Sequence, residues 1–189
     1  MKTSKNGLNL IKQFEGCHLT SYKCPGGVWT IGYGHTNDVK AGQTISQEAA
    51  ELYLRQDLSN AERYVGSYDS IYHFTQDQFD ALVSFTYNAG AGNLKRRLLN
   101  YGKKPIEQVK IDLPATCIKA GGKTLPGLIR RRVAEANLMG ECRKDISLVA
   151  QEALNGYWGN GDRRRKMLTD AGYDYAEVQA AINKLVRGE

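Results

Sequence analysis

Glu15, Cys24 and Thr30 are the residues whose types and spacing most suggest chemistry: Cys24 follows Glu15 by nine residues and Thr30 by fifteen. Glu15 ends an amphipathic helical pattern, and the other two residues lie in a stretch rich in Gly, Tyr and Thr, so one helix end can face two hairpin side chains. A carboxyl group in such a cleft suits a general acid, whereas a thiol can act as a base or nucleophile. Residue type alone also allows Glu15 to be a solvated surface carboxylate.

Cys24 and His35 form a second combination in the same stretch. A thiol with an imidazole base is the nucleophile of cysteine peptidases and amidases, and hydrolysis of amide bonds by that pair would release amines. His35 can instead support the acid by a hydrogen bond across the cleft, or it can be purely structural.

The four cysteines are too few for a disulfide scaffold in a chain of this length, and no Cys-x-x-Cys is present. Cys17 and Cys24 are a candidate redox pair, because a bond between them would consume the Cys24 thiol and block the cleft; two unpaired small hydrophobic residues are the alternative. Cys117 and Cys142 are expected to be core residues or a second pair. The spacing fits no zinc site, so we expect neither a metal nor a cofactor.

The elements that must position these residues are marked by capping and turn signals. We expect a helix over residues 6–15 capped at Asn6, and a small antiparallel hairpin within 19–35 around Pro25-Gly26-Gly27. Ser46 caps a helix to about residue 64, and Thr75 with Gln78 forms a capping box for a helix that ends near residue 90.

The later part of the chain is also predicted to be helical. Helices are expected over 94–101 and 128–139, whereas 103–124 has no clear pattern. Three short helices follow, over 148–154, after residue 162 and from Asp174. A polar segment at 140–145 predicts a boundary near residue 145, which divides the chain into domains of residues 1–145 and 146–189. The fold class is therefore α+β and mostly helical.

Composition restricts the function further. The chain has 189 residues with 41% hydrophobic and 24% charged, as expected for a protein with a packed core. It contains no apolar run long enough to span a membrane, and no apolar region follows the basic start, so neither stable membrane insertion nor a secretory signal is expected. A net charge of +6 favours a polyanionic partner such as an acidic wall polymer. No nucleic-acid recognition motif is present, so nucleic-acid binding is not expected.

Three blocks, residues 15–36, 78–90 and 120–132, resemble the phage-type lysozymes of glycoside hydrolase family 24. The resemblance implies a lysozyme-like domain that cleaves the β-1,4 bond between N-acetylmuramic acid and N-acetylglucosamine in peptidoglycan. In the family's pattern, Glu-x8-(Asp or Cys)-x5-Thr, Glu15 falls on the general acid, Thr30 on the residue that holds the attacking water, and Cys24 where most members have aspartate. The run Arg130-Arg131-Arg132 is then expected to form an ion pair behind the site.

The tail resembles a single cell-wall-binding repeat of other endolysins, through its Trp-Gly-Asn-Gly and Ala-Gly-Tyr-Asp-Tyr blocks. It implies a small three-helix bundle that binds muropeptide or glycan. The predicted binding residues are Trp158, Asp162, Arg163 and Tyr173, and the alternative is that Trp158 and Tyr173 are simply core residues.

The resemblance implies an endolysin, predicted to be monomeric, whose partners are peptidoglycan glycan strands and, through the tail, muropeptide. It is expected to accumulate in the host cytoplasm and to reach the wall through membrane lesions. The alternatives are a lytic transglycosylase, the cysteine peptidase or amidase using Cys24 and His35, and an inactive wall-binding protein.

Overall fold

The computed structural model describes residues 1–24, 26–140, 146–156, 158–170 and 173–188. Most of these residues are helical, and they include two short antiparallel strand pairs, which confirms the predicted fold class. The main helices are α1 (Lys5–Glu15), α2 (Gln47–Gly66), α3 (Asp69–Tyr72), α4 (Gln76–Ala89), α5 (Ala91–Asn93), α6 (Ile106–Asp112), α7 (Pro126–Leu138), α8 (Ile146–Leu154), α9 (Gly161–Asp170) and α10 (Tyr175–Arg187). The strands are β1 (His18–Lys23), β2 (Trp29–Gly32), β3 (Lys119–Ala120) and β4 (Lys123–Thr124).

The β1–β2 hairpin follows directly on α1. Gly16 ends the helix at φ 71°, a left-handed conformation that favours glycine, and the chain then enters β1. Tyr22 pairs with Thr30, and the register shifts between His18 and Tyr22. This order places Glu15 at the base of the hairpin and Thr30 on its second strand. Pro25 of the predicted turn lies outside the described residues.

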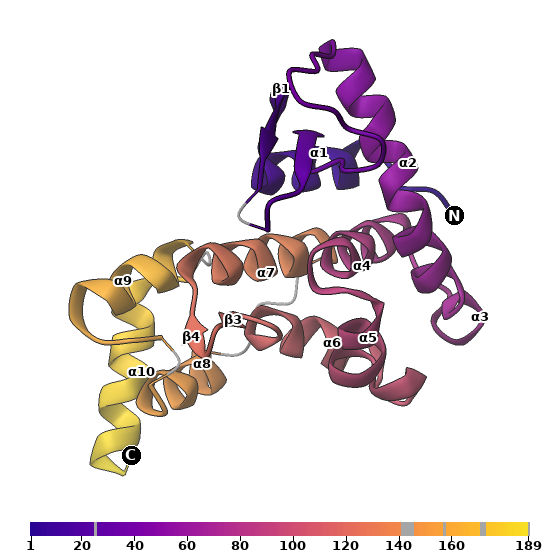
Figure 1. Ribbon diagram of the computed structural model, residues 1–189. Coiled ribbons are helices and arrows are strands. Elements are labelled where there is room, and N and C mark those ends of the chain that lie inside the picture. Colours follow the sequence, from indigo (N-terminus) through magenta and orange to yellow (C-terminus); the bar gives the residue numbers. More distant parts are fainter. Residues whose placement is uncertain (25, 141–145, 157, 171–172, 189) are drawn as a thin grey trace.

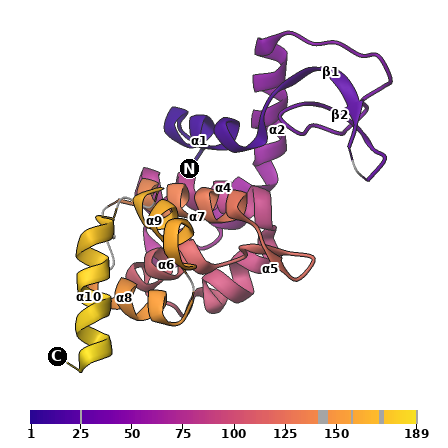
Figure 2. The same cartoon turned by 90° about the vertical axis from the view of Figure 1, so that its left-hand side faces the viewer.

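The larger core is organised around α4. Phe79, Leu82 and Phe85 are fully buried there and pack with apolar residues of α1, α2 and α7. Gly7 lets α1 approach α4 closely, because a Cβ atom at this position would lie 2.7 Å from Cγ of Asp80. Figures 1 and 2 show α1, the hairpin and one end of α2 on one side of α4 and α7.

Most of the predicted helix starts are confirmed. Ser46 caps α2, and Thr75 and Gln78 form both hydrogen bonds of the capping box at the start of α4. The predicted cap at Asn6 is wrong, because Ser4 is the cap: its hydroxyl accepts hydrogen bonds from the N–H groups of Asn6 and Gly7. Ser4 is in turn anchored to Asp80, so α1 starts earlier than its apolar pattern indicates.

The region after α4 is less regular than predicted. The expected helix over 94–101 is a π-helix, η1 (Leu94–Leu98), followed by a 3-10 turn, η2 (Asn100–Gly102), in which Tyr101 has a positive φ of 59°. The unassigned segment contains α6, a second 3-10 turn η3 (Leu113–Ala115), and the β3–β4 hairpin. The hairpin leads into α7, which begins at Pro126 as that residue's missing N–H permits.

Helices α8, α9 and α10 surround a second, smaller core of residues 149–182 that contains Val149, Trp158, Leu168, Val178 and Ile182. This region matches the three predicted tail helices, with Asp174 as the cap of α10. Figures 1 and 2 show these helices on the side of α7 away from the β1–β2 hairpin. The predicted boundary near residue 145 lies outside the described residues.

Among the helices that the structure describes, none combines the length and the apolar character that a membrane crossing requires.

Candidate active site

Glu15 at the end of α1 is held by an arginine of α7. Its Oε1 accepts a hydrogen bond of 2.6 Å from Nη1 of Arg131 on α7, and the Glu15 side chain is 23% exposed. A charge-assisted contact of this length fixes the orientation of a carboxyl group. Among the described residues, the hydrogen bonds of the Glu15 carboxyl group engage Oε1 alone. The predicted ion pair behind the site is therefore present, with Arg131 as its basic member.

Arg131 is itself fixed by a buried polar cluster. Its Nε lies 3.2 Å from Oε1 of Glu135, and Ser84 donates to the same oxygen at 2.7 Å. Arg132 completes the cluster, with Nε 3.1 Å from the other Glu135 oxygen and Nη2 donating to Asn88. Burial raises the pKa of Glu135, and the two guanidinium groups and Ser84 oppose that shift. Arg131, Arg132 and Glu135 are all buried, and the ion pairs between them offset part of the cost of burying their charges.

Cys24 and Thr30 are brought together on the hairpin. Hydrogen bonds from the backbone of Val28 and Gly26 lower the pKa of the Cys24 thiol, and the Thr30 hydroxyl acts in the same direction. Thr30 is 4% exposed, and its hydroxyl also donates to the Val28 carbonyl at 3.1 Å. Groups that favour the thiolate prepare a cysteine for work as a base or nucleophile.

Cys17 and Cys24 are both free thiols in this structure. Cys17 is exposed, and its Sγ lies 3.7 Å from Oε1 of Gln47. Gln47 in turn donates to the Tyr33 hydroxyl at 2.7 Å. Cys117 is also free, and burial raises its pKa; the predicted second member of its pair, Cys142, lies outside the described residues.

His35 lies behind the hairpin. Its Nδ1 is 2.9 Å from both carboxylate oxygens of Asp57 on α2, and its ring stacks on Tyr53 with 4.4 Å between centroids. The His35 backbone pairs with Ile31, next to Thr30. These contacts tie β2 to α2, which gives His35 the geometry of a residue that positions the hairpin. The described contacts include none between His35 and Cys24.

Sequence reasoning missed two residues of this region, Asp57 and Tyr87. The Tyr87 hydroxyl, from α4, donates to the Tyr33 carbonyl of the hairpin at 3.2 Å. Burial raises the Tyr87 pKa, and the nearby charges of Asp57 and Glu15 add to the effect. Tyr87 thus links α4 to the residue that follows β2, close enough to Glu15 for the two groups to interact electrostatically. The signal in the sequence that could have drawn attention to Tyr87 is its place in the last turn of a capped helix, shortly before Gly90.

The predicted wall-binding residues surround the second core. Trp158 is 8% exposed, donates from Nε1 to Glu152 at 3.1 Å, and packs edge-on against Tyr173. Arg163 is exposed, as is Asp162 near the start of α9. Trp158 is therefore largely a core residue, Tyr173 is half-buried against the same core, and Asp162 and Arg163 are the more accessible residues of the set.

No group of three or more His, Cys, Asp or Glu side chains with the arrangement of a metal site occurs within the part of the chain that the structure describes.

Comparisons with known proteins find similarity to phage lysozymes and endolysins. The phage lysozyme family model matches residues 12–135, and the model of the CW_7 repeat matches residues 148–186. An endolysin of Acyrthosiphon pisum secondary endosymbiont phage 1 is 37% identical over 144 residues, which cover 73% of this chain and 97% of that protein. An endolysin of Bacillus phage B103 is 41% identical over 150 residues, covering 73% of this chain and 54% of that protein. The chain therefore spans about half the length of the second relative.

Among solved structures, the muramidase domain of SpmX from Asticaccaulis excentricus superposes with a TM-score of 0.63 at 35% identity. That match covers 75% of this chain and 99% of the domain. The family match over residues 12–135 includes Glu15, Cys24 and Arg131.

Proposed function

The chain belongs to the phage lysozyme family, and from that premise we propose that it is an endolysin that hydrolyses the β-1,4 bond between N-acetylmuramic acid and N-acetylglucosamine in bacterial peptidoglycan. It is a lysozyme-type glycoside hydrolase of the kind placed in glycoside hydrolase family 24. The observation that carries the proposal is the hydrogen bond by which Arg131 orients Glu15. The same family match includes Cys24 and Thr30, whose side chains interact on the hairpin.

The roles follow from the geometry. Glu15 is the general acid: Arg131 engages Oε1, so Oε2 carries the proton that passes to the leaving glycosidic oxygen. An inverting hydrolase needs a second group that activates a water on the opposite face of the sugar, and a carboxylate is the usual choice. Here Cys24 takes that place as a thiolate, and Thr30 holds the water beside it. His35 is a positioning residue for β2 through Asp57 and Tyr53.

We assign residues 1–145 to the catalytic domain and 146–189 to the cell-wall-binding repeat, characterised by its Trp-Gly-Asn-Gly block. Two core clusters and the two family matches support this division. Within the repeat, Tyr173, Asp162 and Arg163 contact the wall, and Trp158 supports them from the core. Muropeptide is the ligand of the repeat, and glycan strands are the substrate of the catalytic domain.

The protein acts as a monomer on the wall, after synthesis in the host cytoplasm and release through membrane lesions made by another protein. The unpaired Cys17 and Cys24 form a redox pair whose disulfide closes the site.

The test is to incubate wild type, Glu15→Gln and Cys24→Ser with peptidoglycan under reducing conditions and to identify the released ends by mass spectrometry. Reducing muramic ends that disappear in Glu15→Gln are expected. Anhydromuramyl ends would instead indicate a lytic transglycosylase, and free amines that depend on Cys24 but not on Glu15 would indicate the cysteine peptidase or amidase. Wild-type protein that pellets with sacculi and releases nothing would indicate an inactive wall-binding protein.

A further inference from the structure

The C-terminal half of α4 contacts both the anchor of Glu15 and the hairpin. The Ser84 carbonyl accepts a hydrogen bond of 3.3 Å from Nη2 of Arg131, and Arg131 in turn donates to Glu15. Tyr87 follows Ser84 by three residues, a spacing that places two side chains on one face of a helix. The same face of α4 therefore supports the arginine that orients Glu15 and carries Tyr87.

The Tyr87 hydroxyl rests against the backbone that directly follows β2. It donates to the Tyr33 carbonyl at 3.2 Å, and a Cβ atom at Gly34 would lie 3.7 Å from Oη of Tyr87. Gly34 has φ 99°, a conformation that favours glycine. One hydroxyl group thus contacts two consecutive residues at the point where the chain leaves the hairpin.

Tyr33 also lies close to the chain that leaves Glu15. In the register of the hairpin, Gly32 pairs with His18, the third residue after Glu15. On α1, Nζ of Lys12 lies 5.8 Å from the centroid of the Tyr33 ring, three residues before Glu15. Tyr33 therefore connects β2 with the last turn of α1.

The side chain of Tyr33 is held separately from its carbonyl. Tyr33 is 7% exposed, and its hydroxyl accepts a hydrogen bond of 2.7 Å from Gln47 on α2. This contact fixes the ring against α2 but leaves the carbonyl free to point elsewhere. Among the described residues, the hydrogen bond from Tyr87 is the one that joins Tyr33 to α4.

The surroundings of the Tyr87 hydroxyl keep it protonated. Burial raises the pKa of Tyr87, the negative charges of Asp57 and Glu15 raise it further, and the positive charge of Arg131 opposes them. A protonated phenol can donate a hydrogen bond at any pH at which the carboxyl groups of the site titrate. The hydroxyl is therefore suited to holding a carbonyl rather than to exchanging a proton.

We propose that the Tyr87 hydroxyl is a positioning group for the hydrolysis: by holding the Tyr33 carbonyl, it sets the β1–β2 hairpin relative to Glu15. Glu15 is referred to α4 through Arg131 and Ser84, and the hairpin is referred to the same helix through Tyr87. Helix α4 thus aligns the general acid with the residues on the hairpin. This inference rests on the proposed function, because it assigns Tyr87 to the reaction of Glu15.

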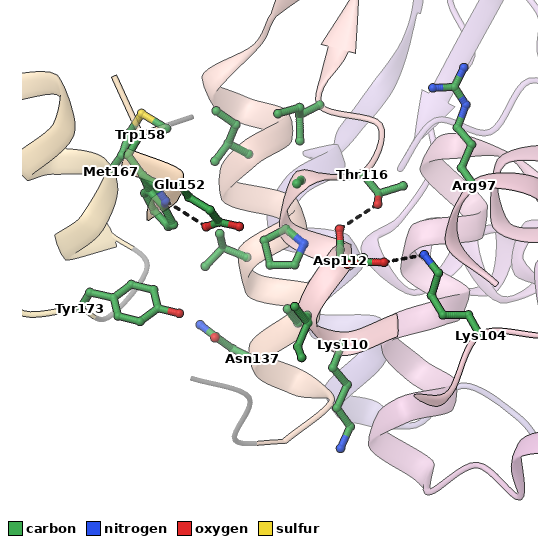
Figure 3. Close-up of a pocket in the computed structure, with 17 residues that line it drawn as sticks. Arg97, Lys104, Lys110, Asp112, Thr116, Asn137, Glu152, Trp158, Met167 and Tyr173 are labelled. Carbon is green, nitrogen blue, oxygen red and sulfur yellow. Dashed lines mark hydrogen bonds and ion pairs between the residues drawn. The ribbon is translucent and has the colours of Figure 1, made fainter. Parts of the chain in front are cut away.

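The test compares Tyr87→Phe with Tyr72→Phe in the full-length protein. Tyr72→Phe is the matched control, because the Tyr72 hydroxyl also donates to a backbone carbonyl, that of Lys104, at 2.8 Å. Figure 3 shows Lys104 paired with Asp112 at a cavity of about 490 Å³, and no residue of α1 or of the β1–β2 hairpin is among the described residues that line it. Thermal melts establish that both variants are folded.

Release of reducing ends is measured against the concentration of glycan strands under reducing conditions. Tyr87→Phe is expected to lower kcat about fivefold and to change KM by less than about twofold, because the net free energy of a neutral hydrogen bond corresponds to a factor of this size. Tyr72→Phe is expected to keep both constants within about twofold of the wild-type values. The ratio of kcat between wild type and Tyr87→Phe is expected to be the same at acidic and at neutral pH, because the hydroxyl stays protonated.

Several results would overturn the positioning role. An undiminished kcat in Tyr87→Phe is one, and an equal loss of kcat in the two variants is another, since that would indicate a general effect of stability. A raised KM with unchanged kcat would show that the hydroxyl binds the glycan instead. A ratio of kcat that changes with pH would show that the hydroxyl exchanges a proton.

The wild-type protein in the same assay separates the two levels of argument. If it releases reducing ends and Tyr87→Phe behaves as Tyr72→Phe does, only this inference fails. If wild type releases no reducing ends, the proposed function fails and this inference fails with it.

Discussion

Replacing Arg131 with methionine tests whether the buried cluster holds Glu15 in place. The arginine contacts Glu15 at 2.6 Å and Glu135 at 3.2 Å, and Glu135 is fully buried. Breaking a buried pair by removing one partner costs about 3–5 kcal/mol, because a charge is left without compensation. Arg132 remains 3.1 Å from Glu135, so we expect the lower end, about 3 kcal/mol. For a chain of this length that corresponds to a fall in Tm of about 6–12 °C.

The loss should depend on pH with a definite sign. Burial raises the pKa of Glu135, and without Arg131 that pKa rises further. When the pKa of a carboxyl group is higher in the folded state than in the unfolded state, the group stabilises the fold at pH values below its unfolded-state pKa. That stabilisation is lost as the pH rises through the folded-state pKa. The gap in Tm between wild type and Arg131→Met should therefore be smaller near about pH 4 than near about pH 7.

The assay is differential scanning calorimetry across this pH range, with Arg130→Met as the control on the exposed face of the same helix. Peptidoglycan turnover by Arg131→Met, measured well below its Tm, should fall because Glu15 loses its anchor. A variant as stable as Arg130→Met, or a gap in Tm that is independent of pH, would refute the reasoning.

Three other predictions concern the hairpin. If the Cys24 thiolate is the base, wild-type activity should decline as the pH falls below the lowered pKa of the Cys24 thiol. Cys24→Asp should retain activity to lower pH, and identical pH–rate profiles of the two proteins would contradict this role. Oxidised protein in which peptide mapping confirms a Cys17–Cys24 disulfide should be inactive until it is reduced, and the activity of Cys17→Ser should be insensitive to oxidant. Full activity of the protein with this disulfide would exclude the proposed redox control. A double-mutant cycle of His35→Asn and Asp57→Asn should give a coupling of about 1–2 kcal/mol in unfolding experiments, and additive losses would show that the contact carries no energy.

Local signals in the sequence predicted much of the fold. The capping box at Thr75 and the cap at Ser46 located two helix starts because side-chain and backbone groups close together in sequence determine them. The cap predicted at Asn6 is wrong because the tertiary contact that favours Ser4, its bond to Asp80, joins residues 76 positions apart. The π-helix at Leu94–Leu98 likewise has no periodic signature that distinguishes it from an α-helix.

The candidate site was predictable in its residue types but not in its supports. The spacing of Glu15, Cys24 and Thr30 is visible in the sequence, as is the arginine run behind them. Asp57 and Tyr87 are not, because their roles depend on contacts across 22 and 54 positions that only folding creates.

The central claim is hydrolysis that depends on Glu15, and digestion in water enriched in the heavy oxygen isotope tests it most directly. We predict that wild type releases muramic reducing ends carrying one heavy oxygen atom from water, and that Glu15→Gln releases none. Products without the heavy isotope, or labelled ends at an undiminished rate in Glu15→Gln, would contradict the account.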